Sequence, residues 1–237
     1  MMDELGEPTM TVLRTTVAPP SRVALDRDER MVKDGILRMG SLVESQIRDA
    51  IRSVVERDAD LAERVIVEDA RVNETQRVIT DTVVMAIATQ SPVARDLRFL
   101  MSLDHVAFEL ERIGDHASGI AKQARRLTEE SPIRETRDLA KIGNLAADQV
   151  RGVVTALIDV DDALAREVAA RDDEIDHGYR AVFSEIIDLM RADPRTVEQG
   201  TRVILAAHWV ERIGDRVTNI AEDVVYLATG KVEDLNP

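Results

Sequence analysis

Hydrophobic residues recur along most of this chain at spacings of three and four positions, the pattern of helices that bury one face. The clearest stripes run through residues 106–124 and 210–227, where aliphatic side chains occupy one side of each helix. No stretch alternates between hydrophobic and polar positions as a half-buried strand does. The pattern therefore predicts an all-α protein whose long helices pack into bundles.

Capping and turn-forming residues interrupt this periodicity and divide it into six long antiparallel helices. The expected ranges are 22–57, a second helix that ends near 89, 92–127, 134–158, 162–191 and 194–229, preceded by a flexible tail over 1–21. The residues expected at the helix ends are Asp58 or Asp60, Ser91 with Pro92, Asp193 with Pro194, and Gly230 after the last helix.

The second half of the chain repeats the first. The sequence ERIGD occurs at 111–115 and again at 211–215, each time in the third helix of its half. The segment 62–74 also resembles 165–177, so that Asp69 corresponds to Asp172 and Asn73 to Asp176. We therefore expect an internal duplication with one three-helix bundle in 22–128 and a second in 133–232.

Composition narrows the classes of function. Hydrophobic residues make up 44% of the chain but aromatic residues only 3%, so the core must be aliphatic. A net charge of −14 argues against a nucleic-acid-binding face. The absence of cysteine excludes disulfides, thiolate metal sites and a cysteine nucleophile. No signal peptide, transmembrane segment, nucleophile–base pair or phosphate-binding glycine loop is evident, so we expect a cytoplasmic protein that is not an enzyme.

The acids of each ERIGD copy lie opposite the hydrophobic stripe, on the expected surface of the bundle. If the second and third helices of each half are antiparallel, these acids reach the same height as the polar pair of the preceding helix. Four oxygen donors per half suit a hard cation. A solvated acidic face remains the alternative, because height does not fix helix rotation. The candidate metal ligands are Asp69, Asn73, Glu111 and Asp115 in the first half, and Asp172, Asp176, Glu211 and Asp215 in the second.

Other residues near these acids carry weaker signals. Gly114 and Gly214 interrupt helices, which indicates a close approach of the backbone of a neighbouring helix. Glu174 and His177 form a Glu-x-x-His pair typical of di-metal bundles, but the second such motif that those bundles need is missing. His116 and His208 are surface histidines near the acids and are expected to be bystanders. The segment 91–100 is either capping chemistry or a charged patch for docking.

Several segments, taken in order, resemble the PhoU family of phosphate-specific transport system accessory and regulatory proteins. They are the ED..VN segment at 68–73, PVARDLR at 92–98, the two ERIGD copies, RDDEID at 171–176 and the Y-x-x-x-G ending at 226–230. The resemblance covers roughly 22–232. It implies two tandem three-helix bundles related by an internal pseudo-twofold, and a homodimer.

The resemblance also implies a function. Members of the family act with the ATPase subunit of the phosphate ABC transporter and with a phosphate-sensing histidine kinase, at the inner face of the membrane through these partners. They limit phosphate uptake and repress phosphate-starvation genes. Family members hold multinuclear iron or zinc clusters on E(D)xxxD motifs, which all the candidate pairs match except that Asn73 departs from the pattern. A metal-binding or storage protein and a PhoU-like regulator of another transporter are the alternatives.

Overall fold

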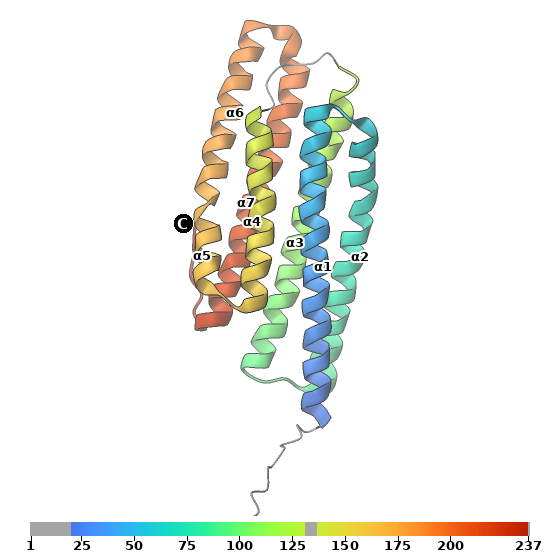
Figure 1. Ribbon diagram of the computed structural model, residues 1–237, viewed down its shortest axis with the longest axis vertical. Helices are drawn as coiled ribbons and strands as arrows, with labels where there is room; N and C mark the ends of the chain where they lie inside the picture. Colours follow the sequence, from blue (N-terminus) through green and yellow to red (C-terminus); the bar gives the residue numbers. More distant parts are fainter. Residues whose placement is uncertain (1–19, 131–136, 237) are drawn as a thin grey trace, which may run out of the picture.

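The computed structural model describes residues 20–130 and 137–236 of the chain (Figure 1). The expected tail over 1–21 lies almost entirely outside the described residues. Within them the chain is helical and contains no strand, which confirms the all-α class. The elements are α1 (Pro20–Glu56), α2 (Ala59–Gln90), α3 (Arg95–Leu127), α4 (Arg137–Asp159), α5 (Asp162–Ala170), α6 (Asp172–Ala192), the short 3-10 helix η1 (Pro194–Thr196) and α7 (Val197–Thr229).

Several helix ends follow the expected capping chemistry. The carboxylate of Asp58 accepts a hydrogen bond from the Leu61 N–H at 2.8 Å and caps α2. Gly230 adopts a left-handed conformation with φ of 73° and donates its N–H to the Tyr226 carbonyl at 2.8 Å, which ends α7. Both contacts satisfy backbone groups that a helix end leaves unpaired.

The prediction that Ser91 caps the start of α3 is wrong. Ser91 has φ of 49° and donates its N–H to the Ile87 carbonyl, so that it closes α2 instead. The following Pro92 has no N–H and cannot continue the helix. As a result α3 begins only at Arg95, and no side chain caps its first turn.

The helix expected over 162–191 is interrupted. Arg171 adopts a turn conformation between α5 and α6, and Asp172 becomes the first residue of the new helix. The first turn of α6 contains three acidic residues, Asp172, Asp173 and Glu174. Negative side chains are favourable at a helix N-terminus because of the helix dipole, so the local sequence stabilises a restart at this point.

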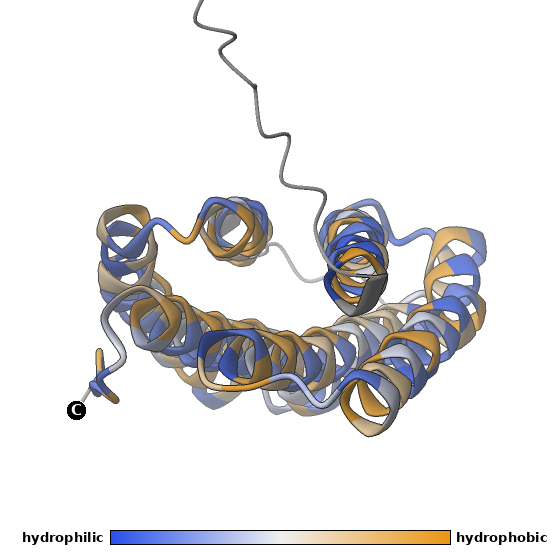
Figure 2. Cartoon of the chain, turned by 90° about the horizontal axis from the view of Figure 1, so that it is seen from below, coloured by the Kyte–Doolittle hydropathy of each residue, from blue (hydrophilic) through white to orange (hydrophobic). Residues whose placement is uncertain are grey.

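The helices run side by side along the long axis of the molecule (Figure 1). The halves meet where α1 packs on α4 and α3 packs on α7. Close approach needs glycine here: a Cβ on Gly143 of α4 would overlap Ile51 of α1. An end-on view shows polar and apolar sides on each helix (Figure 2), and the buried core is aliphatic as expected.

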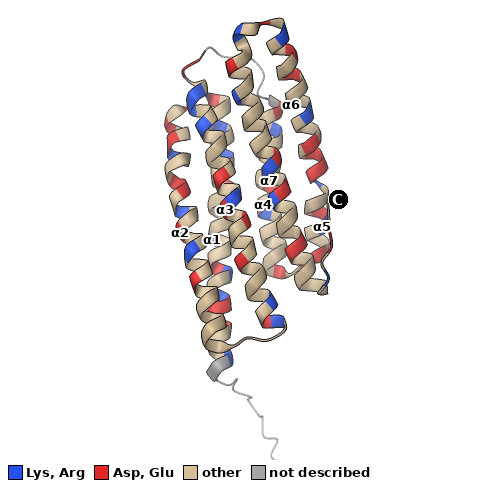
Figure 3. Cartoon of the chain, turned by 180° about the vertical axis from the view of Figure 1, so that it is seen from behind, with Lys and Arg blue, Asp and Glu red and all other residues tan. Residues whose placement is uncertain are grey.

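With α5 and α6 taken as one arm, the architecture is two tandem three-helix bundles, α1–α3 and α4–α7. The boundary expected between 128 and 133 stays a prediction, because 131–136 lie outside the described residues. Charged residues of both signs are interspersed along the helices (Figure 3). Among the described helices, none combines the length and apolar character required to cross a membrane.

Candidate functional site

The glycine of the first ERIGD copy faces a carboxylate on the neighbouring helix. A Cβ placed on Gly114 of α3 would lie 3.3 Å from Asp69 Oδ1 on α2 and 3.3 Å from Gln46 Oε1 on α1. Such contacts are tighter than most real Cβ contacts. The glycine therefore leaves room for two side-chain oxygens from two neighbouring helices, and it is side chains rather than the expected backbone that approach it.

The second copy repeats this arrangement more tightly. A Cβ on Gly214 of α7 would overlap Asp172 Oδ1 at the start of α6. The other carboxylate oxygen of Asp172 accepts a hydrogen bond from Asn236 Nδ2 at 2.9 Å. In both halves the ERIGD glycine thus creates the space in which an acid of the preceding helix lies.

The ERIGD acids lie at the surface of the bundle but are partly covered. The side chains of Glu111 and Glu211 are 22% and 24% exposed, and those of Asp115 and Asp215 are 39% and 44% exposed. The acid on the preceding helix of the second half, Asp172, is only 3% exposed. The second site therefore combines acids at the surface with one buried acid.

Burial and mutual repulsion shift the titration of these acids. Burial, followed by Asp176 and then the acids of the second ERIGD copy, raises the pKa of Asp172 to about 7. Burial also raises the pKa of Asp69, and the Asp115 carboxylate adds to the effect. The pKa of Glu111 is raised in the same way by burial and by Asp115. Each half therefore holds carboxylates in a setting that disfavours their negative charge.

Three oxygen atoms of the candidate residues are buried without a partner among the described residues. They are Asp69 Oδ1, Asn73 Oδ1 and Asp172 Oδ1. A fourth buried atom, Glu211 Oε2, makes no hydrogen bond but lies 3.3 Å from His208 Nδ1. An unpaired buried oxygen is costly, and a cation is the partner that such donors suit. No three Asp, Glu or His side chains of the described residues already converge on one point. The donor set fits a hard cation, whereas a complete coordination shell would need side chains to rotate.

An arginine lies at the edge of each site, and a histidine lies beside the second. Arg112 is 3.5 Å from Asp115, and Arg212 is 3.6 Å from Asp215. His208 Nδ1 lies 3.3 Å from Glu211, within reach of the second site as its spacing in the sequence allows. The two arginines neutralise part of the acidic charge and would have to turn outwards for a metal ion to enter.

His116 is not the surface residue that we expected. It is 9% exposed and stacks on Trp209 of α7 with ring centroids 5.0 Å apart. Burial, then the nearby arginines led by Arg216, lower the pKa of His116 to about 4. His116 is therefore neutral at physiological pH and belongs to the contact between the two repeats.

Two polar neighbours of the sites were missed. Gln46 is only 3% exposed and its Oε1 atom has no hydrogen-bond partner among the described residues. Gln46 lies within the apolar stripe of α1, one residue before the buried Ile47, and this position in the sequence could have predicted that it is buried. Asn236 follows the last helix, and nothing in its sequence neighbourhood indicates that it reaches Asp172.

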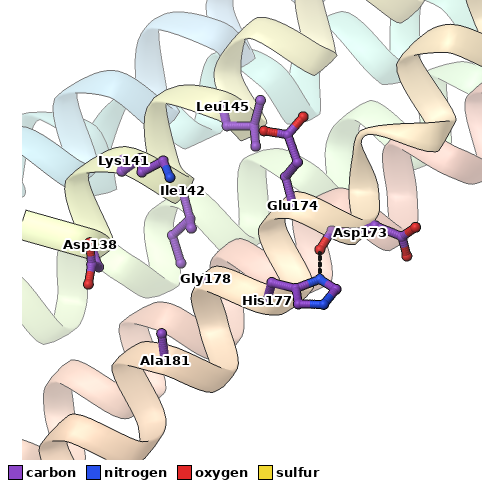
Figure 4. Close-up of a pocket in the computed structure, with 9 residues that line it drawn as sticks. All are labelled: Asp138, Lys141, Ile142, Leu145, Asp173, Glu174, His177, Gly178 and Ala181. Atoms are coloured by element: carbon purple, nitrogen blue, oxygen red, sulfur yellow. Dashed lines mark hydrogen bonds between the residues drawn. The ribbon is translucent and has the colours of Figure 1, made fainter.

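The Glu-x-x-His pair does not form a metal site in the described residues. Glu174 and His177 line a cavity of about 530 Å³ between α4 and α6 (Figure 4). The His177 ring lies on the outer side of α6, where Nδ1 is 2.6 Å from the Asp173 carbonyl oxygen, while Glu174 points towards Leu145. The two side chains point in different directions.

Known proteins share this architecture. The family model described as the PhoU domain matches residues 36–124 and 139–224, so each match contains one ERIGD copy. The chain belongs to the PhoU family. A "Phosphate-specific transport system accessory protein PhoU homolog" from Clostridium acetobutylicum is 35% identical over 91% of this chain and 99% of its own length. A protein of the same description from Pseudomonas putida is 38% identical over 84% of this chain and 78% of its own length.

Solved structures of the family agree with the fold. PhoU from Pseudomonas aeruginosa superposes with a TM-score of 0.83 at 36% identity, covering 87% of this chain and 99% of that one. The phosphate transport system regulatory protein PhoU from Streptococcus pneumoniae gives a TM-score of 0.82 at 30% identity, covering 89% and 99%. Family membership and the two-bundle architecture therefore stand on both sequence and structure, while the role of the eight candidate ligands stays a prediction.

Proposed function

We propose that this protein is a non-enzymatic regulator of phosphate transport. The observation that carries the proposal is the match to the PhoU family in both repeats, together with relatives named as accessory proteins of the phosphate-specific transport system. The chain covers 99% of the length of the Clostridium relative, so the proposal draws on nearly the whole of that accessory protein.

The mechanism that we propose is that of an adaptor. The bundles bind the ATPase subunit of a phosphate ABC transporter and a phosphate-sensing histidine kinase, as a homodimer in the cytoplasm at the inner face of the membrane. When phosphate is plentiful, this contact limits uptake and keeps phosphate-starvation genes repressed. The acidic character of the chain supports docking to basic partner surfaces.

The two ERIGD sites are proposed to hold iron or zinc. Asp69, Asn73, Glu111 and Asp115 would bind metal in the first half, and Asp172, Asp176, Glu211 and Asp215 in the second. The support is the buried, unpartnered oxygen in each half, Asp69 Oδ1 and Asp172 Oδ1. A bound cation would supply positive charge where the folded chain has gathered carboxylates, and so stabilise the contact between the helices.

The adaptor role is tested by deleting the gene and measuring a phosphate-starvation reporter in high phosphate. We expect the reporter to be expressed constitutively, and normal repression in the deletion strain would contradict the proposal. Affinity purification of the tagged protein should recover a phosphate transporter ATPase and a histidine kinase. Recovery of a different transporter would favour the alternative of a PhoU-like regulator of another system.

The alternative of a metal-storage protein is separated by a site variant. Asp172→Asn with Asp176→Asn should remove metal from the second site without preventing the bundle from folding. If metal is auxiliary to docking, the variant still recovers the transporter ATPase. Loss of metal with unchanged gene repression would leave the adaptor role intact, whereas growth defects only under metal excess or limitation would favour storage.

A further inference from the structure

A cavity of about 250 Å³ opens where the first turns of α1 and α3 meet the α4–α5 connection and the end of α7. It therefore lies between the two repeats and at a distance along the chain from both ERIGD copies. Four cationic side chains line it, against two carboxylates, in a chain whose net charge is −14. The cations are Arg22, Lys33, Arg95 and Arg98, and the carboxylates are Glu29 and Asp96.

Among the described residues, three of the four cations are in no ion pair, although Lys33 is close enough to Glu29 to act on the charge of its carboxylate. Arg22 is bound to Asp96 and Asp26. In the part of the chain that the structure describes, Lys33, Arg95 and Arg98 form no ion pair; Lys33 Nζ lies 4.9 Å from the Phe99 ring centre, and Arg98 lies 5.9 Å from that of Tyr226. Arginines on other surfaces of this acidic protein, such as Arg48, do pair with carboxylates. The cavity thus holds more positive than negative side chains, four cations against two carboxylates.

The start of α3 adds to the positive potential. Its N-cap residue, Ala94, provides no side-chain acceptor, and the helix continues for 33 residues. The first N–H groups of a long helix point towards its N-terminal end and favour a negative ligand there. The acid of the first turn, Asp96, is already engaged by Arg22, which leaves the neighbouring arginines available.

We propose that this cavity binds a small oxyanion of the phosphate type, held by Lys33, Arg95 and Arg98 at the start of α3. Arginine presents a fork of donors that matches tetrahedral oxyanions, and lysine adds a point charge. The opposing group is Glu29, whose pKa is raised by burial and by Asp96, so its negative charge is disfavoured beside the cavity. Because Val160 and Leu227 of the second repeat complete the wall, an occupant would join the two repeats.

The test is calorimetric titration of the full-length, chelator-treated protein with inorganic phosphate at low and constant ionic strength. We expect saturable binding of one phosphate per chain. The double variant Lys33→Ala/Arg95→Ala should weaken binding at least tenfold, because it removes two charged donors. The matched control Arg38→Ala/Arg126→Ala removes two exposed cations from the same two helices and should leave the affinity within twofold.

Three outcomes would overturn the proposal: no saturable binding, equal weakening in both double variants, or binding that returns only when metal is added back. The last result would place the anion at the ERIGD sites instead. A second titration with glycerol phosphate separates two sources of the same chemistry. Tighter binding of the ester would identify a phosphorylated metabolite as the ligand, and tighter binding of inorganic phosphate would identify the free ion.

Discussion

The two ERIGD sites use the same five residues but place the opposing acid differently. In the first repeat Asp69 lies in the middle of the continuous helix α2. In the second repeat Asp172 is the first residue of α6, after the break at Arg171, and is almost fully buried. Both repeats therefore keep the glycine and the acids of the ERIGD helix. They differ in the backbone that carries the opposing acid, which is a continuous helix for Asp69 and a helix start for Asp172.

The difference shows that a helix break can change the electrostatics of a site without changing its motif. Burial and surrounding carboxylates raise the pKa of Asp172 to about 7, whereas the pKa of Asp69 is raised without a shift of that size. The second site also has Asp176 where the first has Asn73, although Arg180 pairs with Asp176 at 2.8 Å. The second site holds four carboxylates against three in the first, so we expect it to bind cations more tightly once Arg180 is displaced.

The largest expected effect is the pH dependence of stability in the metal-free protein. The pKa of Asp172 is 3.8 in the unfolded reference and about 7 in the folded protein, so the folded state holds the proton more strongly. Stability should therefore fall as pH rises from about 4 to 8, by up to about 4 kcal/mol from this residue. Urea unfolding with a chelator present measures the loss.

Asp172→Asn should remove most of that dependence, because the amide cannot ionise. Asp69→Asn is the matched variant in the first repeat and should have a smaller effect. A similar flattening by both variants would mean that the two sites are electrostatically equivalent, which would remove the distinction drawn between them.

A second comparison concerns the two glycines. Gly214→Ala would place a methyl group onto Asp172 Oδ1, so we expect a loss of about 1–3 kcal/mol in the free energy of unfolding. Gly114→Ala meets Val72 Cγ1 at 3.2 Å and Asp69 Oδ1 at 3.3 Å, where small movements suffice. The gain of roughly 1 kcal/mol in helix propensity offsets that strain. Denaturant unfolding of both variants at one pH tests this, and equal losses would contradict it.

The smallest expected effect is on metal affinity in the first repeat. Asn73→Asp would give the first site the carboxylate that Asp176 provides in the second, and should tighten binding of zinc by roughly tenfold, about 1.4 kcal/mol. The control Asn144→Asp adds the same charge to an exposed position of α4. Competition titration with a metal indicator measures both, and an equal change in the two variants would point to a general charge effect.

The sequence was sufficient to predict the all-α fold and most of the helices, but not the break at Arg171 or the start of α3. It also placed Asp69 at the height of the first ERIGD copy and Asp172 at that of the second, and the electrostatic effect of these acids on one another agrees with that placement. Periodicity defines the buried face of a helix. Two residues at equal distances from the turn between antiparallel helices lie at the same level along the helix axes. Family resemblance supplied the pseudo-twofold arrangement in advance. These features depend on local patterns that the chain repeats.

The missed features depend on contacts between segments that lie far apart in the chain. The burial of His116 follows from its contact with Trp209, which belongs to the other repeat. The covering of Asp172 depends on helix rotation and on Asn236 beyond the last helix. The turn at Arg171 contains no proline or glycine, so the sequence carries no usual signal of a helix break there. The acids in the first turn of α6 favour a new helix start at this point.

The contact between His116 and Trp209 has a practical consequence. Trp209 is the single tryptophan of the chain, and its indole also fills the space beside Gly119 of α3. Its emission therefore arises from one place, the seam between α3 and α7. Because the pKa of His116 is lowered to about 4, the stacked ring stays uncharged near neutrality and its charge state does not vary the signal. The fluorescence of Trp209 is thus an intrinsic probe of the packing between the two repeats. It needs no label and can be followed while ligands or partners are added.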